Sequence, residues 1–203
     1  MISSASIGVF SLSEEFNSKK YRIDAREFFA QLNKLGIEYV LVGGLALLNY
    51  VDGRNTNDVD VIVAMEDIEK LEDFHQDDID GDFARGKFRS LIVDVLLPRN
   101  PLFKMVLQDY AVEGKLDDIP IKIAAPLGLL ILKLYALPSL YRQGNFENVA
   151  LYEADITQLL LRKDVNADEA LVLLKNHLSS VDIDELKKII AEINNRRKRF
   201  TTS

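Results

Sequence analysis

The sequence predicts an α/β (α+β) protein in which helices flank a mixed sheet and a C-terminal helical bundle follows. Up to about residue 125, short apolar runs of strand length alternate with amphipathic segments of helical period. From Pro126 onward only the helical period remains. The chain of 203 residues is long enough for one domain and a smaller second one, so we expect domains at residues 1–125 and 126–203.

Composition and charge exclude several classes of protein. The chain is 48% hydrophobic, carries a net charge of −7 and has no cysteine, so disulfides and thiolate zinc sites are excluded. Its longest apolar run, residues 127–132, is far shorter than a spanning helix, and the N-terminus lacks the basic and apolar regions of a signal peptide. We expect a cytoplasmic protein without a membrane partner. Its acidic charge does not attract nucleic acid in bulk.

The first elements follow from local signals. Residues 1–20 show no period and are expected to form an irregular extension. Asp24–Leu35 has the pattern of an amphipathic helix, with Asp24 as its N-cap and Gly36 at its end. Glu38–Val42 is rich in β-branched and aromatic residues, which predicts a short buried strand.

The same signals place the remaining elements. We expect strands at Asp58–Val63, Gly86–Leu97, Ala111–Glu113 and Ile119–Ile123, and an acidic turn at Asp77–Gly81. We expect helices at Leu45–Tyr50, Glu66–Phe74, Pro101–Asp109, Pro126–Leu137 (ended by Pro138), Val149–Leu161, Ala167–Leu178 (capped by Asn166) and Ile183–Arg199 (capped by Asp182).

Three aspartates are the strongest candidates for chemistry. Asp58 and Asp60 are one residue apart at the start of a strand, so both carboxylates point to the same face. Like charges this close repel unless a cation lies between them, and magnesium prefers such oxygen ligands. Asp94 interrupts an apolar strand, where a buried unpaired carboxylate is unfavourable. If the two strands are adjacent, the three carboxylates can hold two metal ions. The alternative is a strand entry with solvated carboxylates.

A glycine pair and a polar loop surround these aspartates. Gly43-Gly44 lies at a strand-to-helix turn, where glycine lets backbone N–H groups approach a phosphate; a plain tight turn is the alternative. In the loop, Arg54 either neutralises phosphate or pairs with Asp52 or Asp58, and Thr56 shapes the chain.

Taken in order, these residues resemble the nucleotidyltransferase superfamily related to DNA polymerase β, and most closely the AbiEii-type toxins and minimal nucleotidyltransferases of bacterial toxin–antitoxin systems. The shared pattern is a hydrophobic strand, Gly-Gly-x-Ala, Arg-x-Thr-x-Asp-x-Asp, and a carboxylate on a later strand. It is carried by Gly43, Gly44, Ala46, Arg54, Thr56, Asp58, Asp60 and Asp94. The resemblance implies a nucleotidyltransferase-like sheet that binds one or two Mg²⁺ ions and an NTP such as ATP.

The C-terminal part adds a second likeness to the same group. Pro126–Ala136 matches Pro-x-x-x-Leu-x-x-Lys-Leu-x-Ala, and a following helix bears Asp-Ile-x-x-Leu-Leu. The resemblance implies that Lys133 contacts nucleotide phosphates and that Asp155 supports the site. A purely structural Lys133–Asp155 ion pair is the alternative. The linker Pro138–Phe146 lacks the Arg/Lys-rich connection often seen in the family, which leaves the acceptor open.

The resemblance implies a Mg²⁺-dependent enzyme that transfers an NMP from an NTP to an acceptor hydroxyl and releases pyrophosphate. The setting it implies is the toxin-like component of a type IV toxin–antitoxin system that acts on tRNA and has a cognate antitoxin partner. The first alternative is an antitoxin-type protein adenylyltransferase or a small-molecule nucleotidyltransferase. The second is a non-catalytic nucleotide-binding or protein-interaction module.

Other conspicuous residues have ordinary explanations. The basic run Arg196–Arg199 fits the C-terminal end of a helix, with a phosphate- or RNA-contacting tail as the alternative. His75 and His177 stand apart and are expected to be surface residues.

Overall fold

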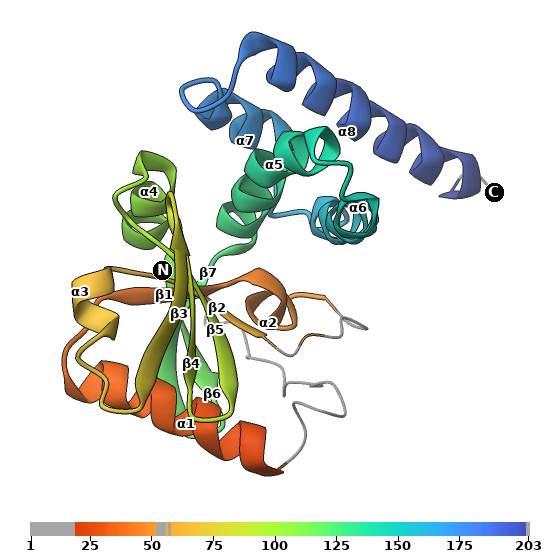
Figure 1. The fold of residues 1–203 in the computed structure, drawn as a ribbon. Coiled ribbons are helices and arrows are strands. Elements are labelled where there is room, and N and C mark those ends of the chain that lie inside the picture. Colours follow the sequence, from red (N-terminus) through yellow and green to blue (C-terminus); the bar gives the residue numbers. More distant parts are fainter. Residues whose placement is uncertain (1–18, 52–55, 57, 202–203) are drawn as a thin grey trace. The chain divides into compact units, whose positions relative to one another are not determined.

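The computed structural model describes residues 19–51, 56 and 58–201, so the extension predicted for residues 1–20 lies almost wholly outside the described residues. The described chain divides into two compact units, of which the first ends at Ala125 and the second begins at Pro126 (Figure 1). The first unit contains strands and helices, and the second contains helices.

The first unit is built on a mixed sheet, as predicted. Within the part of the chain that the structure describes, seven strands lie in the order β3-β4-β5-β2-β1-β7-β6. Their bounds are β1 Tyr39–Val42, β2 Asp58–Val63, β3 Phe74–Asp80, β4 Phe83–Phe88, β5 Leu91–Leu96, β6 Ala111–Leu116 and β7 Ile119–Ala124. The β2–β5 and β1–β7 pairs are parallel, and the other pairs are antiparallel.

Helix α1 covers one face of this sheet. The helices of the unit are α1 Lys19–Lys34, α2 Gly43–Leu47, α3 Met65–Ile68 and α4 Pro101–Asp109. Phe28 and Phe29 of α1 are fully buried, and their rings lie 5.3 Å from Phe88 and 5.6 Å from Tyr39. Alternation along the strands puts the buried valines of β2 and β5 on this same face. The aspartates of those strands therefore lie on the opposite face.

The region predicted as one strand, Gly86–Leu97, contains a hairpin. Strands β4 and β5 are joined by Arg89-Ser90, with Phe88 opposite Leu91, and Arg89 has a φ of 54°. Asp24, buried inside α1 rather than capping it, accepts hydrogen bonds from the backbone N–H and the hydroxyl of Ser90. Arg89 also donates to Asp73 over 2.6 Å. These contacts hold an arginine in a turn position that sequence reasoning assigns to glycine or asparagine.

The segment after β2 also differs from its prediction. The helix expected at Glu66–Phe74 ends after one turn at Ile68, and the expected acidic turn forms most of strand β3. Strand β3 is at the edge of the sheet, and its residues after Phe74 are exposed. Charged side chains on such an edge discourage pairing with other chains, so this strand needs no apolar alternation.

The second unit consists of helices within the described residues. They are α5 Pro126–Arg142, α6 Phe146–Leu160, α7 Ala167–Leu174 and α8 Ser180–Thr201. Helix α5 continues past Pro138, which is buried, so the predicted end there is wrong. Asn166 caps α7 as predicted, with its side chain accepting from the Asp168 N–H over 2.9 Å. Among the described helices, none has the length and apolar character that crossing a bilayer requires.

The start of α8 corrects the predicted cap. Asp182 lies within the first turn, and Ser179 precedes the helix. The Asp182 N–H donates to the Ser179 hydroxyl over 3.1 Å, and that hydroxyl donates to the Asp182 carboxylate over 2.8 Å. Asp182 is three positions after the cap, the position that the acidic residue of a capping box occupies.

Two arginines of α1 donate hydrogen bonds to Asp117 in the β6–β7 turn. Arg22, followed by Arg26, lowers the pKa of Asp117 to about 2 by hydrogen bonding. A lowered pKa contributes stability above the ordinary carboxyl range, and this contribution is lost as pH falls toward 2. Asp117→Asn keeps a side chain that tolerates the φ of 55° found there. We expect its deficit in free energy of unfolding, measured by urea titration, to be present at pH 6 and to shrink below pH 4. A deficit independent of pH would contradict this assignment.

Candidate active site

A row of charged side chains crosses three neighbouring strands. In strand register, Asp60 of β2 lies beside Asp94 of β5, and Asp94 lies beside Arg85 of β4. Residues in register on adjacent strands point to the same face of a sheet, so the three side chains form one line. The predicted proximity of Asp94 to Asp60 follows directly from this pairing.

Asp58 lies on the same face, two residues before Asp60. It is half-buried, and burial raises the pKa of its carboxyl group, with a further upward contribution from the negative charge of Asp94. Arg85 opposes this rise in the pKa of Asp58. The site therefore concentrates negative charge in a partly desolvated place, which is a condition that favours a bound cation.

Arg85 is a member of the site that the sequence analysis missed. Its Nε and Nη2 atoms donate to the two oxygens of Asp94 over 2.6 and 2.7 Å. The Asp94 side chain is 24% exposed and has a cationic partner in Arg85, so the unfavourable state considered from the sequence, a buried and unpaired carboxylate, does not occur. Once Arg89-Ser90 is recognised as a turn, the alternation of charged with small or apolar residues in Phe83–Phe88 predicts a strand with Arg85 on its exposed face.

The turn at Gly43-Gly44 packs against the side chain of Asp60. Val42 at the end of β1 is in register with Asp60, and Gly43 follows with a φ of 65°. A Cβ atom at Gly43 would lie 2.0 Å from Asp60 Oδ2, closer than any real contact. Glycine is therefore required at position 43 both by the backbone conformation and by the approach of the carboxylate.

Gly43→Ala tests this packing. We expect the variant to lose about 1–3 kcal/mol of stability through the left-handed φ, with a further loss from the clash with Asp60. Thermal unfolding followed by circular dichroism measures the total. Gly36→Ala is a matched control, because Gly36 also has a φ of 65° but has open space around the added methyl group. Equal losses in the two variants would show that the Asp60 contact adds nothing.

The aspartates suit a divalent cation as a partial ligand set. Carboxylate oxygens are the ligands magnesium prefers, and it commonly takes one or two of them and completes its shell with water and substrate phosphates. Among the described residues, no three acidic, histidine or cysteine side chains are arranged to hold a metal ion by themselves. Asp58 and Asp60 fit the protein's share of such a site, while Asp94 is bonded to Arg85.

The polar loop before β2 is only partly described. Thr56 is half-buried, two residues before Asp58. Arg54 and its suggested partner Asp52 lie outside the described residues.

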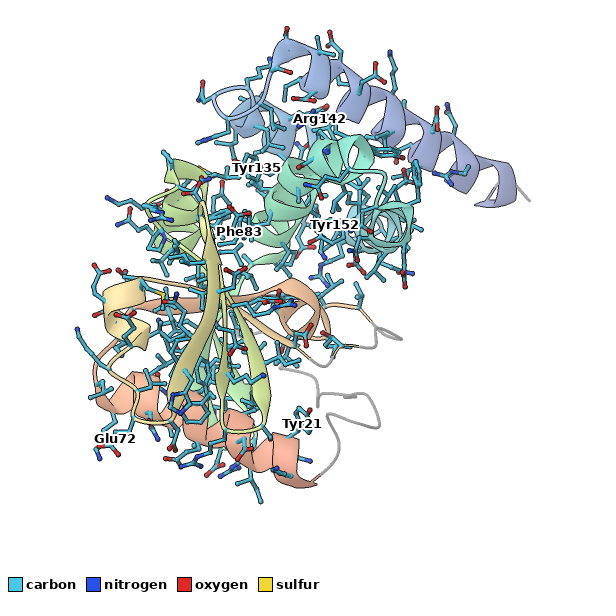
Figure 2. All side chains as sticks on the ribbon, viewed as in Figure 1. Tyr21, Glu72, Phe83, Tyr135, Arg142 and Tyr152 are labelled. Atoms are coloured by element: carbon cyan, nitrogen blue, oxygen red, sulfur yellow. The ribbon has the colours of Figure 1, made fainter. Side chains whose placement is uncertain are left out.

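Lys133 and Asp155 form a buried ion pair within the second unit. Lys133 Nζ lies 2.9 Å from Asp155 Oδ2, and the two side chains are 7% and 6% exposed. The same ammonium lies 3.8 Å from the ring centroid of Tyr152 on α6, which is labelled in Figure 2. The sequence suggested two roles for Lys133, contact with phosphate and a structural ion pair, and both include this contact with Asp155.

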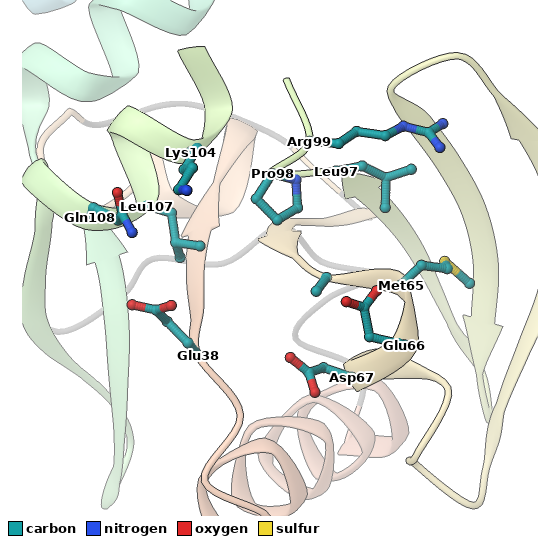
Figure 3. A pocket seen from close by; sticks show the side chains of 11 residues that line it. Glu38, Met65, Glu66, Asp67, Leu97, Pro98, Arg99, Lys104, Leu107 and Gln108 are labelled. Atoms are coloured by element: carbon teal, nitrogen blue, oxygen red, sulfur yellow. The ribbon is translucent and has the colours of Figure 1, made fainter. Parts of the chain in front are cut away.

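A cavity of about 400 Å³ opens at the other end of the sheet (Figure 3). Glu38, Ala64 and Leu97 line it, next to the start of β1 and the ends of β2 and β5. Asp60 is four residues from Ala64 along an extended strand, a separation of roughly 13 Å. The cavity is therefore separate from the carboxylates of Asp58, Asp60 and Asp94, which together form the carboxylate row.

Comparison with known proteins identifies the fold. No protein-family model and no curated protein matches the chain. Among solved structures, the chain is similar to an antigenic nucleotidyltransferase-like protein from Paracoccidioides brasiliensis, with a TM-score of 0.59 and 17% identity over 91% of this chain and 92% of that chain. It is also similar to ANT(2'')-Ia in complex with adenylyl-2''-tobramycin, with a TM-score of 0.50 and 11% identity over 88% of this chain and 99% of that chain.

The protein therefore has the fold of nucleotidyltransferase-like proteins. At these identities the similarity concerns the fold, which agrees with the mixed sheet and flanking helices predicted from the sequence. The closer resemblance to AbiEii-type toxins stays a prediction.

Proposed function

We propose that this protein is a Mg²⁺-dependent nucleotidyltransferase that transfers an NMP from an NTP to an acceptor hydroxyl. The observation that carries the proposal is the convergence of Asp58, Asp60 and Asp94 on one sheet face, with the Gly43 turn packed against Asp60. The nucleotidyltransferase-like fold supports it. Three neighbouring carboxylates on one sheet face repel one another, a repulsion that Arg85 offsets only in part and that a bound divalent cation would relieve further.

Separate residues would bind the metal ion, bind the phosphates and act on the acceptor hydroxyl during NMP transfer. Asp58 and Asp60 would bind Mg²⁺, which neutralises phosphate charge and polarises the reacting phosphoryl group. The backbone of Gly43-Gly44 at the start of α2 would lie against the phosphates. In the transfer, the acceptor oxygen forms a bond to the α-phosphorus as the bond to the bridging oxygen breaks and pyrophosphate leaves. We assign to Asp94 either acceptance of the hydroxyl proton or binding of a second ion.

Arg54, Thr56, Lys133 and Asp155 complete the set of residues that the sequence suggests. By resemblance, we assign Arg54 to phosphate neutralisation and Thr56 to nucleotide binding; the alternative for Thr56 is that it only shapes its loop. Lys133 is proposed as a phosphate contact supported by Asp155 on the same ground. The burial of that pair favours the structural alternative, because the Lys133 side chain is only 7% exposed and its ammonium already contacts Asp155 and the ring of Tyr152.

By resemblance, we propose a toxin-like role on tRNA, in a type IV toxin–antitoxin pair located in the cytoplasm. A protein or small-molecule acceptor is the first alternative, and the complex of ANT(2'')-Ia with adenylyl-2''-tobramycin shows an adenylylated antibiotic bound to a similar fold. A non-catalytic binding module is the alternative of another class.

One labelling experiment separates these possibilities. The protein is incubated with each α-labelled NTP, Mg²⁺ and either total RNA or cell lysate. The Asp58→Ala/Asp60→Ala double variant is run beside it. Label in RNA supports the tRNA acceptor, label in protein or small molecules supports the first alternative, and no label supports the binding module. Equal labelling by the double variant would contradict the assignment of the site.

A further inference from the structure

Arg85 occupies the place of a counter-ion within the carboxylate row. It donates two hydrogen bonds to Asp94 through both Nε and Nη2, so both Asp94 oxygens are engaged. Its side chain is 58% exposed, so the guanidinium can exchange this partner for water without breaking a packed core. The pair is thus well aligned and readily opened.

Arg85 also interacts electrostatically with Asp58 and Asp60. The hydrogen bond and charge of Asp94, and more weakly the charges of Asp58 and Asp60, raise the pKa of the Arg85 guanidinium above its ordinary value. One cation therefore interacts with all three carboxylates. A divalent ion at Asp58 and Asp60 would be repelled by the Arg85 guanidinium. It would also find the carboxylate of Asp94 already hydrogen-bonded to Arg85.

We propose that Arg85 competes with the divalent cation for Asp94 and thereby sets how tightly this site binds metal before nucleotide arrives. While no metal is bound, the positive charge of Arg85 offsets part of the repulsion among the three carboxylates. When a cation binds, Arg85 releases Asp94, which then faces the ion. This inference rests on the proposed function, because it takes the aspartates as the metal site.

Mn²⁺ binding to the full chain without nucleotide, followed by electron paramagnetic resonance, tests the competition. Two effects act together in Arg85→Gln: Asp94 no longer has to leave its exposed pair with Arg85, and the repulsion between the guanidinium and the ion is removed, each worth about threefold in affinity at moderate salt. We therefore expect Arg85→Gln to bind Mn²⁺ about tenfold more tightly than the wild type. In an Asp94→Asn background, the same substitution should give only the roughly threefold tightening that comes from the repulsion, since no carboxylate remains at position 94 to be released.

Lys87→Gln is the matched control. Lys87 is two residues from Arg85 on the same strand, is 59% exposed and lies 3.5 Å from Asp77 on the edge strand. Its removal changes the net charge equally but frees no site carboxylate, so its effect on Mn²⁺ affinity should be under about threefold. Arg85→Gln that binds Mn²⁺ no more tightly than Lys87→Gln would overturn the competition.

The Asp58→Asn/Asp60→Asn variant separates this inference from the proposed function. If that variant binds Mn²⁺ like the wild type, or if no variant binds it, the metal site itself is misassigned and both proposals fail. If that variant loses binding but Arg85→Gln shows no tightening, only the role of Arg85 fails. Circular dichroism of each variant confirms that the chains compared are folded.

Discussion

Asp58→Asn is expected to reduce NMP transfer by about 10³-fold while the protein stays folded. The carboxylate supplies charge to the proposed metal site, and the amide that replaces it is a weaker ligand of nearly the same shape. The measurement is the initial rate of label transfer from an α-labelled NTP in the presence of Mg²⁺. Asp80→Asn on the exposed edge strand removes one negative charge away from the row and should keep full activity.

The stability of Asp58→Asn should move in the opposite direction from its activity. Burial and then Asp94 raise the pKa of Asp58, so its ionisation opposes folding. A raised pKa gives stability that is present at low pH and is lost as pH rises through the folded-state value. Without metal, the variant should therefore be at least as stable as the wild type at pH 7, and this advantage should vanish near pH 3. A folded variant with full transfer activity would contradict the role of Asp58.

Lys133→Ala is expected to lower the free energy of unfolding by about 3–5 kcal/mol. The substitution leaves Asp155 buried without its cation and removes the ammonium from the face of Tyr152. Urea unfolding at pH 7 measures the loss. Lys187→Ala is the control, because Lys187 pairs with Asp184 over 2.7 Å on an exposed helix face, where such pairs contribute under about 1 kcal/mol.

A double variant distinguishes the two roles left open for this lysine. Lys133→Met/Asp155→Leu replaces the buried pair with apolar side chains of similar volume, a change that is often neutral for stability. If Lys133 is structural, the double variant recovers stability and keeps NMP transfer. If Lys133 contacts phosphate, the double variant is stable but transfers more slowly, with a raised KM for the NTP. Loss of only 0–1 kcal/mol in Lys133→Ala would contradict the buried pair.

The carboxylate row shows which parts of the site a sequence can predict. Alternation along a strand is local, so the common face of Asp58 and Asp60 follows from two positions. The position of Asp94 beside them requires that β2 and β5 are neighbours, an assumption that the parallel pairing fulfils. Arg85 was missed because the turn at Arg89-Ser90 has no glycine or asparagine, and only tertiary contacts from Asp24 and Asp73 explain it.

Elsewhere, tertiary structure overrides local signals. The acidic segment of β3 has turn-like composition but forms a strand, because β4 offers it a pairing edge. Pro138 ends a helix in an isolated sequence, yet the buried packing around it carries α5 on to Arg142. In contrast, β2 and α4 have the bounds predicted from their apolar runs and the flanking proline.

The most direct test of the proposed site is a crystal structure with Mn²⁺ and a non-hydrolysable NTP analogue. The anomalous signal of manganese locates the ion independently of the protein model. We predict an anomalous peak in contact with the carboxylates of Asp58 and Asp60, with the analogue's phosphates beside Gly43-Gly44. A nucleotide bound away from this face, with no manganese at either aspartate, would contradict the assignment of this protein as a nucleotidyltransferase.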